Sequence, residues 1–486
     1  MHSDVLIVGA GSAGSVLAER LSTDERCQVT VVESGPGPAD PRVLSQITDG
    51  LRLPIGSASS VVSRYLTTLT DAPKRHAQLV RGAVVGGSGA INGGYFCRAL
   101  PSDIDGWGYD GWAWADVLPH FKAIENDLDF DNPLHGSDGP ITVRRVAEFG
   151  GCTESFVASA LRAGFDWISD LNGSTPESPV QWGVGAVPLN INGGNRVGPG
   201  AAFLLPALGR RNLTMLTGTR VGRIQIEKGR VAAVECRGPH GKLVLTADQI
   251  VLCAGAIGSA HLLMLSGIGP EPVLRAAGVP VEAALPVGGS TVDHPEWVLP
   301  VSWPPADGSP PLEAILATRD GLEIRAYTAG FSALTSGRRE GLADQPHLGV
   351  ALMRPRSRGR ITLASADPDV APVIEHRYDS EAADIQLLRA GTQLAYEIAC
   401  STVQPEELWA TSQHLCGSAQ MGAAGDRAAV VDNRCRVFGV DGLWVVDGSI
   451  LPAIPSRGPH ATIVMVGHRA AEFITSVSSE VHYLSE

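Results

Sequence analysis

Cys-x-x-Cys pairs are absent from the 486-residue sequence, although it contains eight cysteines. Their wide spacing argues against a zinc ribbon, a thioredoxin-like site and a disulfide framework. We therefore expect no metal site, and we expect most of the thiols to be buried and reduced. The cysteines are Cys27, Cys97, Cys152, Cys236, Cys253, Cys400, Cys416 and Cys435.

Long apolar runs and a signal peptide are also missing. No stretch reaches the roughly 18 apolar residues that a membrane helix needs. The N-terminus lacks a basic region followed by an apolar core. We expect a cytoplasmic protein that contacts a membrane at most peripherally, at its inner face. The sequence does not determine an oligomeric state.

Positive charge is scarce, because the formal net charge is −13. The one dense basic run consists of alternating arginines, which predicts four side chains on one face of a strand. These residues are Arg354, Arg356, Arg358 and Arg360. Nucleic acid is therefore not an expected partner.

Length and composition indicate a large α/β protein. At 486 residues the chain exceeds what one hydrophobic core usually organises, and its 44% hydrophobic content suits well-packed interiors, so we expect two structural units. The 57 glycines and 33 prolines are spread along the chain, which is typical of many tight turns.

The N-terminal segment predicts a strand, a glycine turn and a helix. An apolar run from Asp4 meets Gly9, Gly11, Ser12 and Gly14, and a helical pattern follows over residues 15–21. In a dinucleotide-binding turn the first glycine permits the turn, the second lets backbone approach a pyrophosphate, and the third allows close helix packing. An ordinary glycine turn is the alternative.

A second strand is expected at residues 29–32, ending in Glu33 and Ser34. A carboxylate about 20 residues beyond the glycines can bind ribose hydroxyls. This combination favours dinucleotide binding over an ordinary turn, but it does not distinguish NAD from FAD.

Residues 81–94 form another glycine-rich segment, which contains Gly86, Gly87, Asn92 and Gly93. The segment is too rich in glycine for a buried helix and suits backbone laid against a bound group. A flexible loop is the alternative, and the apolar residues within the segment disfavour it.

This segment resembles the first signature of the glucose–methanol–choline oxidoreductases, and residues 255–269 resemble the second. Residues 286–294 are similar to the family's following Asp-His element. Residues 356–359, together with Asp367 and Pro368, match a further recurring stretch. The similarity extends from about residue 4 to about residue 473. Within it, the arginine run is better interpreted as structural.

The resemblance implies an α/β protein with a Rossmann-like FAD-binding domain and an α+β substrate domain built on an antiparallel sheet. The FAD-binding domain would comprise residues 1–106, 202–292 and 414–486, and the substrate domain residues 107–201 and 293–413. Members that bind flavin covalently often carry His one residue before the signature Asn, where this chain has Ile91. The resemblance therefore implies non-covalent FAD.

The resemblance also implies which residues contact FAD. Val221 occupies the position whose backbone usually contacts the adenine. The full expected set is Gly9, Gly11, Ser12, Gly14, Glu33, Ser34, Gly86, Gly87, Asn92, Gly93, Val221, Ala254, Gly255, Asp447, Gly448, Ala461 and Thr462.

Two C-terminal segments carry the expected catalytic residues. His414 begins a stretch similar to the family's His-x-x-Gly-Thr motif, with three departures: Ser418, Ala419 and Gln420. His460 falls where the family places its second catalytic residue. Breaking an alcohol C–H bond by hydride transfer requires a group that takes or holds the hydroxyl proton, and imidazole titrates in the right range. We assign His414 as the general base and His460 as the hydrogen-bonding partner, with the reverse assignment left open.

A helical pattern follows His460 over residues 462–474. The free N–H groups and partial positive charge at its start could stabilise the anion of reduced flavin. Among the remaining histidines, His294 is interpreted as part of a family structural element. His261 and His468 are interpreted as structural residues of helices.

Three functional hypotheses remain. Residues 87–98 and the compact length most resemble the family members encoded with the mycofactocin system, which implies oxidation of mycofactocinol with electrons passed to a respiratory acceptor. The alternative is a dehydrogenase or oxidase of choline or another small alcohol. Choline would require an aromatic cage or a carboxylate near the histidines, and aromatic residues make up only 5% of the chain. The third hypothesis, a non-catalytic FAD-binding protein, is disfavoured by the presence of both histidines.

Overall fold

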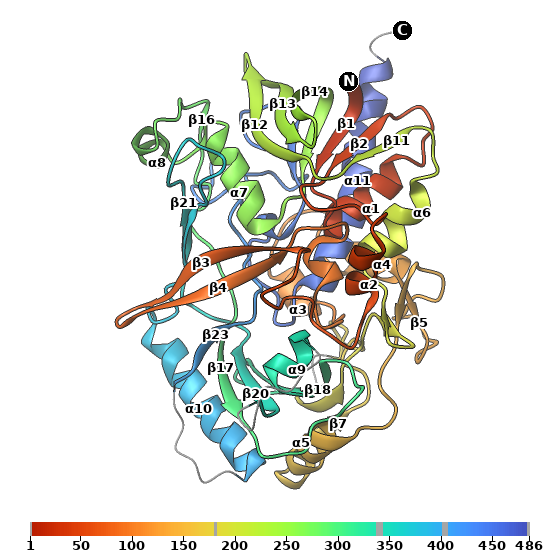
Figure 1. Ribbon diagram of the computed structural model, residues 1–486, viewed down its shortest axis with the longest axis vertical. Coiled ribbons are helices and arrows are strands. Elements are labelled where there is room, and N and C mark those ends of the chain that lie inside the picture. Colours follow the sequence, from red (N-terminus) through yellow and green to blue (C-terminus); the bar gives the residue numbers. More distant parts are fainter. Residues whose placement is uncertain (1, 179–181, 337–343, 401–406, 484–486) are drawn as a thin grey trace.

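The computed structural model describes residues 2–178, 182–336, 344–400 and 407–483, and the side chains as far as residue 475. Two large sheets occupy opposite ends of the molecule, with a long two-stranded hairpin projecting between them (Figure 1). Helices and parallel and antiparallel strands are combined, as the predicted α/β class requires.

The first seven-stranded sheet contains the N-terminal strand. Its order is β11 (Leu213–Leu216), β2 (Val29–Val32), β1 (His2–Val8), β14 (Gly241–Leu252), β13 (Arg230–Gly238) and β12 (Arg220–Glu227), and β24 (Leu443–Val445) also pairs with β14. The pairs β11–β2, β2–β1, β1–β14 and β14–β24 are parallel, while β12, β13 and β14 form an antiparallel meander. Strands from three distant parts of the chain therefore complete one sheet.

The expected strand, turn and helix at the N-terminus are confirmed. The apolar residues of β1 are buried, and α1 (Ser12–Leu21) follows the glycine turn directly. The C-terminal helix α11 (His460–Tyr483) packs against α1, and α7 (Gly255–Leu265) follows β14. The helix expected at residues 462–474 thus begins at His460 and extends further.

The second seven-stranded sheet lies at the other end of the molecule (Figure 1). Its order is β23 (Trp409–Thr411), β17 (Pro295–Pro300), β20 (His347–Leu352), β19 (Leu322–Tyr327), β18 (Leu312–Ala317), β8 (Gly183–Ala186) and β7 (Asp166–Ile168). All its pairs are antiparallel except β7–β8. The helices α5 (Gly151–Arg162) and α10 (Ala382–Ala399) pack on it and share a separate hydrophobic cluster.

A smaller sheet lies between the two. The hairpin of β3 (Val62–Asp71) and β4 (Lys74–Gly82) pairs through β3 with β22 (Val373–Glu375), which pairs with β21 (Arg360–Thr362). The prediction that four alternating arginines share a strand face is wrong, because only Arg360 lies in a strand. The preceding residues form a loop whose amides at Arg356 and Ser357 donate to the Asp384 carboxylate.

Shorter elements connect these sheets. They are α2 (Pro41–Thr48), α3 (Pro101–Asp105), α4 (Trp114–Ile124), β5 (Glu125–Asp127), β6 (Ile141–Val143), β9 (Ile191–Asn192), β10 (Asn195–Arg196), α6 (Leu205–Ala207), β15 (Ile268–Gly269), α8 (Glu271–Ala276), β16 (Ala283–Ala284) and α9 (Phe331–Ser336), with single helical turns at Gly87–Ala90, Gly200–Leu204 and Gly448–Ile450.

All eight cysteines are free, and six of them are buried, as expected. Among the helices of the described residues, none combines the length and the apolar character needed to span a bilayer. The domain boundaries stay a prediction.

Candidate active site

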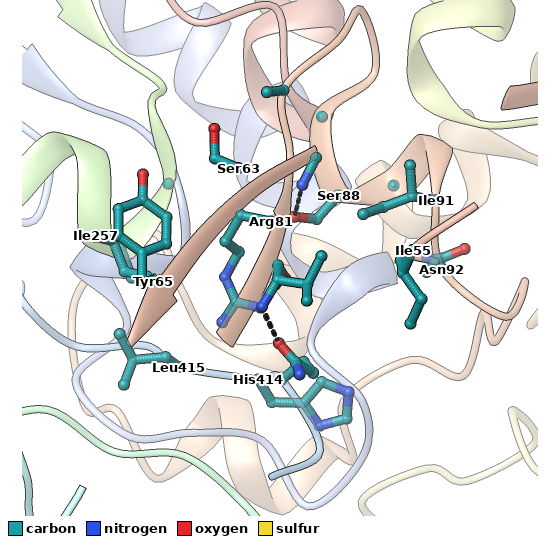
Figure 2. A pocket seen from close by; sticks show the side chains of 18 of the residues that line it. Ile55, Ser63, Tyr65, Arg81, Ser88, Ile91, Asn92, Ile257, His414 and Leu415 are labelled. Carbon is teal, nitrogen blue, oxygen red and sulfur yellow. Dashed lines mark hydrogen bonds between the residues drawn. The ribbon is translucent and has the colours of Figure 1, made fainter. Parts of the chain in front are cut away.

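A cavity of about 1220 Å³ lies between the glycine turn after β1 and the second sheet. Pockets for single small molecules usually measure about 300–1,000 Å³, so this cavity has room for a large cofactor and a substrate. Figure 2 shows part of its lining, with side chains from the β3–β4 hairpin, the glycine-rich segment and the segment that carries His414.

The geometry of the turn explains why glycine occupies positions 9 and 14. Gly9 has a φ of +102°, and a Cβ there would lie 2.6 Å from the carbonyl oxygen of Cys253. A Cβ at Gly14 would lie 2.0 Å from the carbonyl oxygen of Gly9. Gly11 differs from both. A Cβ there would lie 3.5 Å from its nearest neighbour, the carbonyl oxygen of Cys253, and the residue lines the cavity. Gly9 and Gly14 therefore allow close packing, while Gly11 leaves the cavity open.

Glu33 lies at the end of β2 with its carboxylate facing the turn. Its Oε2 accepts from Ala10 N at 2.9 Å and its Oε1 from Gly35 N at 2.8 Å. Burial raises the pKa of this carboxyl, although the backbone hydrogen bonds and Ser34 oppose the shift. The residue lines the cavity, where the sequence predicts that a carboxylate binds ribose hydroxyls.

The segment at residues 81–94 contacts the glycine turn. Gly87 has a φ of +55°, and a Cβ there would lie 2.8 Å from the Cα of Gly11. The hydroxyl of Ser88 accepts a hydrogen bond from Gly82 N at 3.1 Å, and the Asn92 side chain accepts one from Gly94 N at 3.0 Å. These contacts hold the segment in an ordered conformation instead of a free loop.

Asp447 connects the C-terminal segment to the start of α7. Its Oδ2 accepts hydrogen bonds from Gly255 N at 2.8 Å and from the Ser259 hydroxyl at 2.6 Å. Its Oδ1 accepts one from Ser449 N at 2.8 Å. Burial raises the pKa of the Asp447 carboxyl, against the effect of these hydrogen bonds. Asp447 thereby fixes the short stretch that includes Gly448 at the cavity wall.

Most of the expected cofactor-binding residues line this one cavity. Four do not: Gly14 lies in the first turn of α1, Gly86 precedes the helical turn at Gly87–Ala90, and Ala461 and Thr462 are buried in the first turn of α11. Those that line it are Gly9, Gly11, Ser12, Glu33, Ser34, Gly87, Asn92, Gly93, Val221, Ala254, Gly255, Asp447 and Gly448.

His460 begins α11 and lines the cavity. Its Nδ1 lies 3.4 Å from the Ser12 hydroxyl, and its ring packs edge-on against Phe96. Among the described residues, its buried Nε2 has no hydrogen-bond partner. Burial, assisted by the charge of Arg196, lowers the pKa of His460 to about 4.

His414 lines the same cavity from the segment after β23 (Figure 2). Its backbone N–H donates to Asp293 Oδ1 at 2.8 Å, and its Nδ1 lies 2.9 Å from Nδ1 of His294. Burial lowers the pKa of His414 well below its usual value, and His294 and the positive charge of Arg325 add to the effect. Both expected catalytic imidazoles are therefore neutral at pH 7.

Sequence reasoning missed the residues that hold His414. Asp293 accepts the backbone N–H groups of both His294 and His414, and its other oxygen accepts from the hydroxyls of Tyr378 and Thr411. The Asp-His element was visible in the sequence, but nothing local indicated a partner 120 residues away. The buried charges of Glu296 and Arg325 at the cavity wall were missed as well.

The described residues fit FAD. The cavity is large, Gly11 leaves it open beside the turn, and the start of α11 reaches it with an unpaired imidazole nitrogen. A helix start also presents free N–H groups and partial positive charge to a bound group. A dinucleotide laid along the two glycine-rich segments would thus reach His460.

A buried ionic cluster lies outside the cavity lining. His135 lies 2.8 Å from Asp170 and 2.9 Å from Asp127, and it is also near Glu125. Glu125, Asp127 and His135 lie close enough to ligate one metal ion. Arg98 contacts Glu125, and Arg145 contacts Asp127 at 2.8 Å, so guanidinium groups already supply positive charge to these carboxylates.

Comparison with known proteins agrees with this geometry. The chain matches family models described as GMC oxidoreductase over residues 3–296 and 355–467. It is 41% identical to a GMC-type oxidoreductase from the thcA 5′ region of Rhodococcus erythropolis, covering 97% of this chain and 98% of that protein. It is 32% identical to an oxygen-dependent choline dehydrogenase of Rhizobium etli, covering 98% and 96%.

A solved structure leads to the same conclusion. The fold matches that of pyridoxine 4-oxidase from Mesorbium loti with a TM-score of 0.87 and 29% identity, covering 97% of this chain and 98% of that one. The resemblance read from the glycine-rich and histidine motifs is thereby confirmed. The chain belongs to the GMC oxidoreductase family and is an oxidoreductase.

Proposed function

We propose that the protein is an FAD-dependent dehydrogenase that takes a hydride from an alcohol carbon. One observation carries the proposal: His414 and His460 line a single cavity that also includes the two glycine-rich segments. The arrangement supports the proposal, because two neutral imidazoles share one cavity with the segments that are expected to hold a dinucleotide.

The two histidines divide the proton chemistry. A neutral imidazole can accept the hydroxyl proton of an alcohol, and the lowered pKa of His414 keeps it neutral at physiological pH. The unpaired Nε2 of His460 can hold the substrate oxygen as negative charge develops on it. We assign the general base to His414. In the reverse assignment, His460 would accept the proton and His414 would hold the substrate oxygen.

Bound FAD would supply the hydride acceptor at flavin N5. The glycine turn, Glu33, the segment at residues 81–94 and Asp447 would hold it. Non-covalent binding is part of the proposal, because Ile91 lines the cavity where covalently flavinylated members often carry His.

The proposed substrate is mycofactocinol, oxidised to mycofactocin. The resemblance of residues 87–98 and the compact chain length support this choice. Electrons would then pass to a respiratory acceptor, which implies a cytoplasmic protein in peripheral contact with a membrane component.

Oxidation of choline or another small alcohol is the second candidate. A relative at 32% identity is named a choline dehydrogenase, and the Glu296 carboxylate lines the cavity. A non-catalytic FAD-binding protein is the third candidate. This candidate gives no reason for His414 and His460 to line the same cavity.

An anaerobic reduction assay tests the proposal. The purified, FAD-loaded protein is mixed separately with mycofactocinol, choline and simple primary alcohols, and the absorbance of oxidised flavin is followed. We expect mycofactocinol to bleach the flavin faster than choline or the simple alcohols do. Faster bleaching by choline or a simple alcohol would support the second candidate, and an unbleached flavin with all of these substrates would contradict both candidates.

A further inference from the structure

Four buried charged residues form a chain beside the part of the cavity wall that carries Ser412 and His414. Arg325 Nη1 lies 2.9 Å from Glu296 Oε2, and Arg325 Nε lies 2.7 Å from Glu323 Oε1. Arg457 Nη1 lies 3.8 Å from the other oxygen of Glu323. At most 4% of each of these residues is exposed.

Neutral hydroxyls complete the network. Tyr327 donates to Glu296 Oε1 at 3.1 Å, and Tyr95 donates to Glu323 Oε2 at 2.9 Å. The Ser412 hydroxyl donates to Glu296 Oε2 at 2.7 Å and accepts from Arg325 at 2.8 Å. Each oxygen of Glu296 is therefore already engaged inside the protein.

This network reaches the cavity close to the catalytic residues. Glu296, Arg325, Tyr327, Tyr95 and Ser412 all line the cavity. Ser412 lies two positions before His414, and the charge of Arg325 contributes to the lowered pKa of His414. A substrate held against His414 would therefore meet this wall.

The network has no net charge. Two carboxylates, Glu296 and Glu323, are balanced by two guanidinium groups, Arg325 and Arg457.

A quaternary ammonium has no N–H group to donate and is recognised by unbalanced negative charge or by aromatic faces. The ring of Tyr327 is stacked on His347, with 4.5 Å between the ring centroids, so one of its faces is already taken. A quaternary ammonium against this balanced wall would lose its hydration with at most a partial gain from the rings of Tyr95 and Tyr327.

Other charged groups near this wall do not restore a cation site. Asp344 lines the cavity, but its two oxygens accept the backbone N–H groups of Ser332 and Ala333, each at 2.9 Å. Arg81 also lines the cavity and hydrogen-bonds Gln413. Its positive charge is opposed by the Asp293 carboxylate that accepts from the His414 N–H group, so this pair adds no net charge either.

We propose that this balanced wall selects an uncharged alcohol over a quaternary ammonium alcohol of the same shape, and that Arg325 sets the preference. The inference rests on the proposed alcohol oxidation and narrows its substrate class. It also predicts that the Glu296 carboxylate becomes a cation site only when Arg325 loses its charge.

Choline and 3,3-dimethylbutan-1-ol provide a matched pair of probes, because a carbon replaces the charged nitrogen in the second. For each alcohol we would measure the rate of anaerobic flavin reduction and, separately, the dissociation constant from the change in the oxidised flavin spectrum. The wild-type holoenzyme should prefer the uncharged probe by at least about tenfold in both quantities.

Three variants isolate the role of Arg325. Arg325→Gln leaves Glu296 unbalanced and should shift the preference toward choline by about tenfold or more. Glu296→Gln leaves an extra positive charge and should weaken choline binding further. The double variant Glu296→Gln/Arg325→Gln removes both charges and should restore the wild-type preference, so it also serves as the control if Arg325→Gln does not fold.

The outcomes separate this inference from the proposed function. Equal or stronger binding of choline by the wild type would overturn the inference, as would an unchanged preference in Arg325→Gln. Failure of both probes to change the flavin spectrum at any soluble concentration would also overturn it. Binding with the expected preference but without flavin reduction, by the two probes and by mycofactocinol alike, would support the neutral wall while contradicting the proposed alcohol oxidation.

Discussion

Nδ1 of His294 lies 2.9 Å from Nδ1 of His414, although the two residues are 120 positions apart. Two imidazole nitrogens at this distance must share one proton, so His294 determines which nitrogen of His414 is engaged. The rings meet at nearly a right angle, 89° between their planes. His294 therefore has a positioning role toward His414 that its place in a structural element did not reveal.

Replacing His294 should impair the reaction without removing the cofactor. In His294→Phe we expect FAD to remain bound and flavin reduction by the substrate to slow by roughly tenfold to 100-fold, because the His414 ring loses its orientation. The pKa of His414 should rise, since His294 contributes to its depression. As the pH is lowered, the rate of flavin reduction measured by stopped flow should begin to fall at a higher pH in the variant than in the wild type. Partial rescue in His294→Asn would support hydrogen bonding as the cause, and an unchanged pH profile in His294→Phe would contradict it.

His414→Ala should retain FAD but reduce flavin at least about 100-fold more slowly, the usual scale for loss of an acid–base group. His460→Ala should show a comparable loss if His460 holds the substrate oxygen. His240→Ala, at an exposed position, is the matched control. Wild-type reduction kinetics in His414→Ala would reject its assignment as the base.

Gly11→Val should yield a folded protein without FAD. A Cβ at Gly11 meets only ordinary contacts, but the remaining side chain would project into the cavity where the pyrophosphate is expected. Gly209→Val, at an exposed site with nothing within 4 Å, is the control. Flavin absorbance per protein and circular dichroism would check the result, and a fully yellow Gly11→Val protein would contradict it.

Lowering the pH should reduce the free energy of unfolding already at pH values above those at which carboxyl groups titrate. Burial lowers the pKa of His294, His376 and His460 to about 4, from the usual 6.5. Between these values the unfolded chain binds protons that the folded chain does not. The free energy of unfolding should then fall by up to about 1.4 kcal/mol per pH unit for each such histidine. Urea unfolding at pH 7, 6 and 5 measures this slope, and constant stability over that range would contradict the prediction.

The contribution of His135 to stability should depend on pH in the opposite direction. Its pKa is raised to about 10, because hydrogen bonds to Asp127, Asp170 and Glu125 outweigh burial. The stability that protonated His135 contributes is complete below pH 6.5 and is lost as the pH rises toward 10. His135→Gln should therefore destabilise the protein most at pH 6 and progressively less toward pH 10. A destabilisation that does not change with pH would refute a charged His135.

Local motifs were readable from the sequence, and contacts between distant segments were not. The turn at Gly9, Gly11 and Gly14 could be predicted because strand, turn and helix are continuous in the chain. The place of the Asp293 carboxylate between two histidine segments could not, because it depends on the register of β17 and β23 in the second sheet.

The alternating arginines show why one periodic pattern can mislead. A period of two predicts a strand only when neighbouring strands are available, and the loop before β21 is held instead by the Asp384 carboxylate. The charges of Glu296 and Arg325 were equally visible in the sequence. The sequence could not show that these two charges neutralise each other, because they meet only through the antiparallel pairing of β17, β20 and β19.

The pairing of β24 with β14 and the packing of α11 on α1 have a consequence for biosynthesis. A ribosome makes β1, β2 and the glycine turn long before it makes β24 and α11, which complete this half of the molecule. His460 is part of that last helix. The cavity consequently closes only after β24 and α11 have left the ribosome, and until then the incomplete first sheet of a nascent chain must be protected from aggregation.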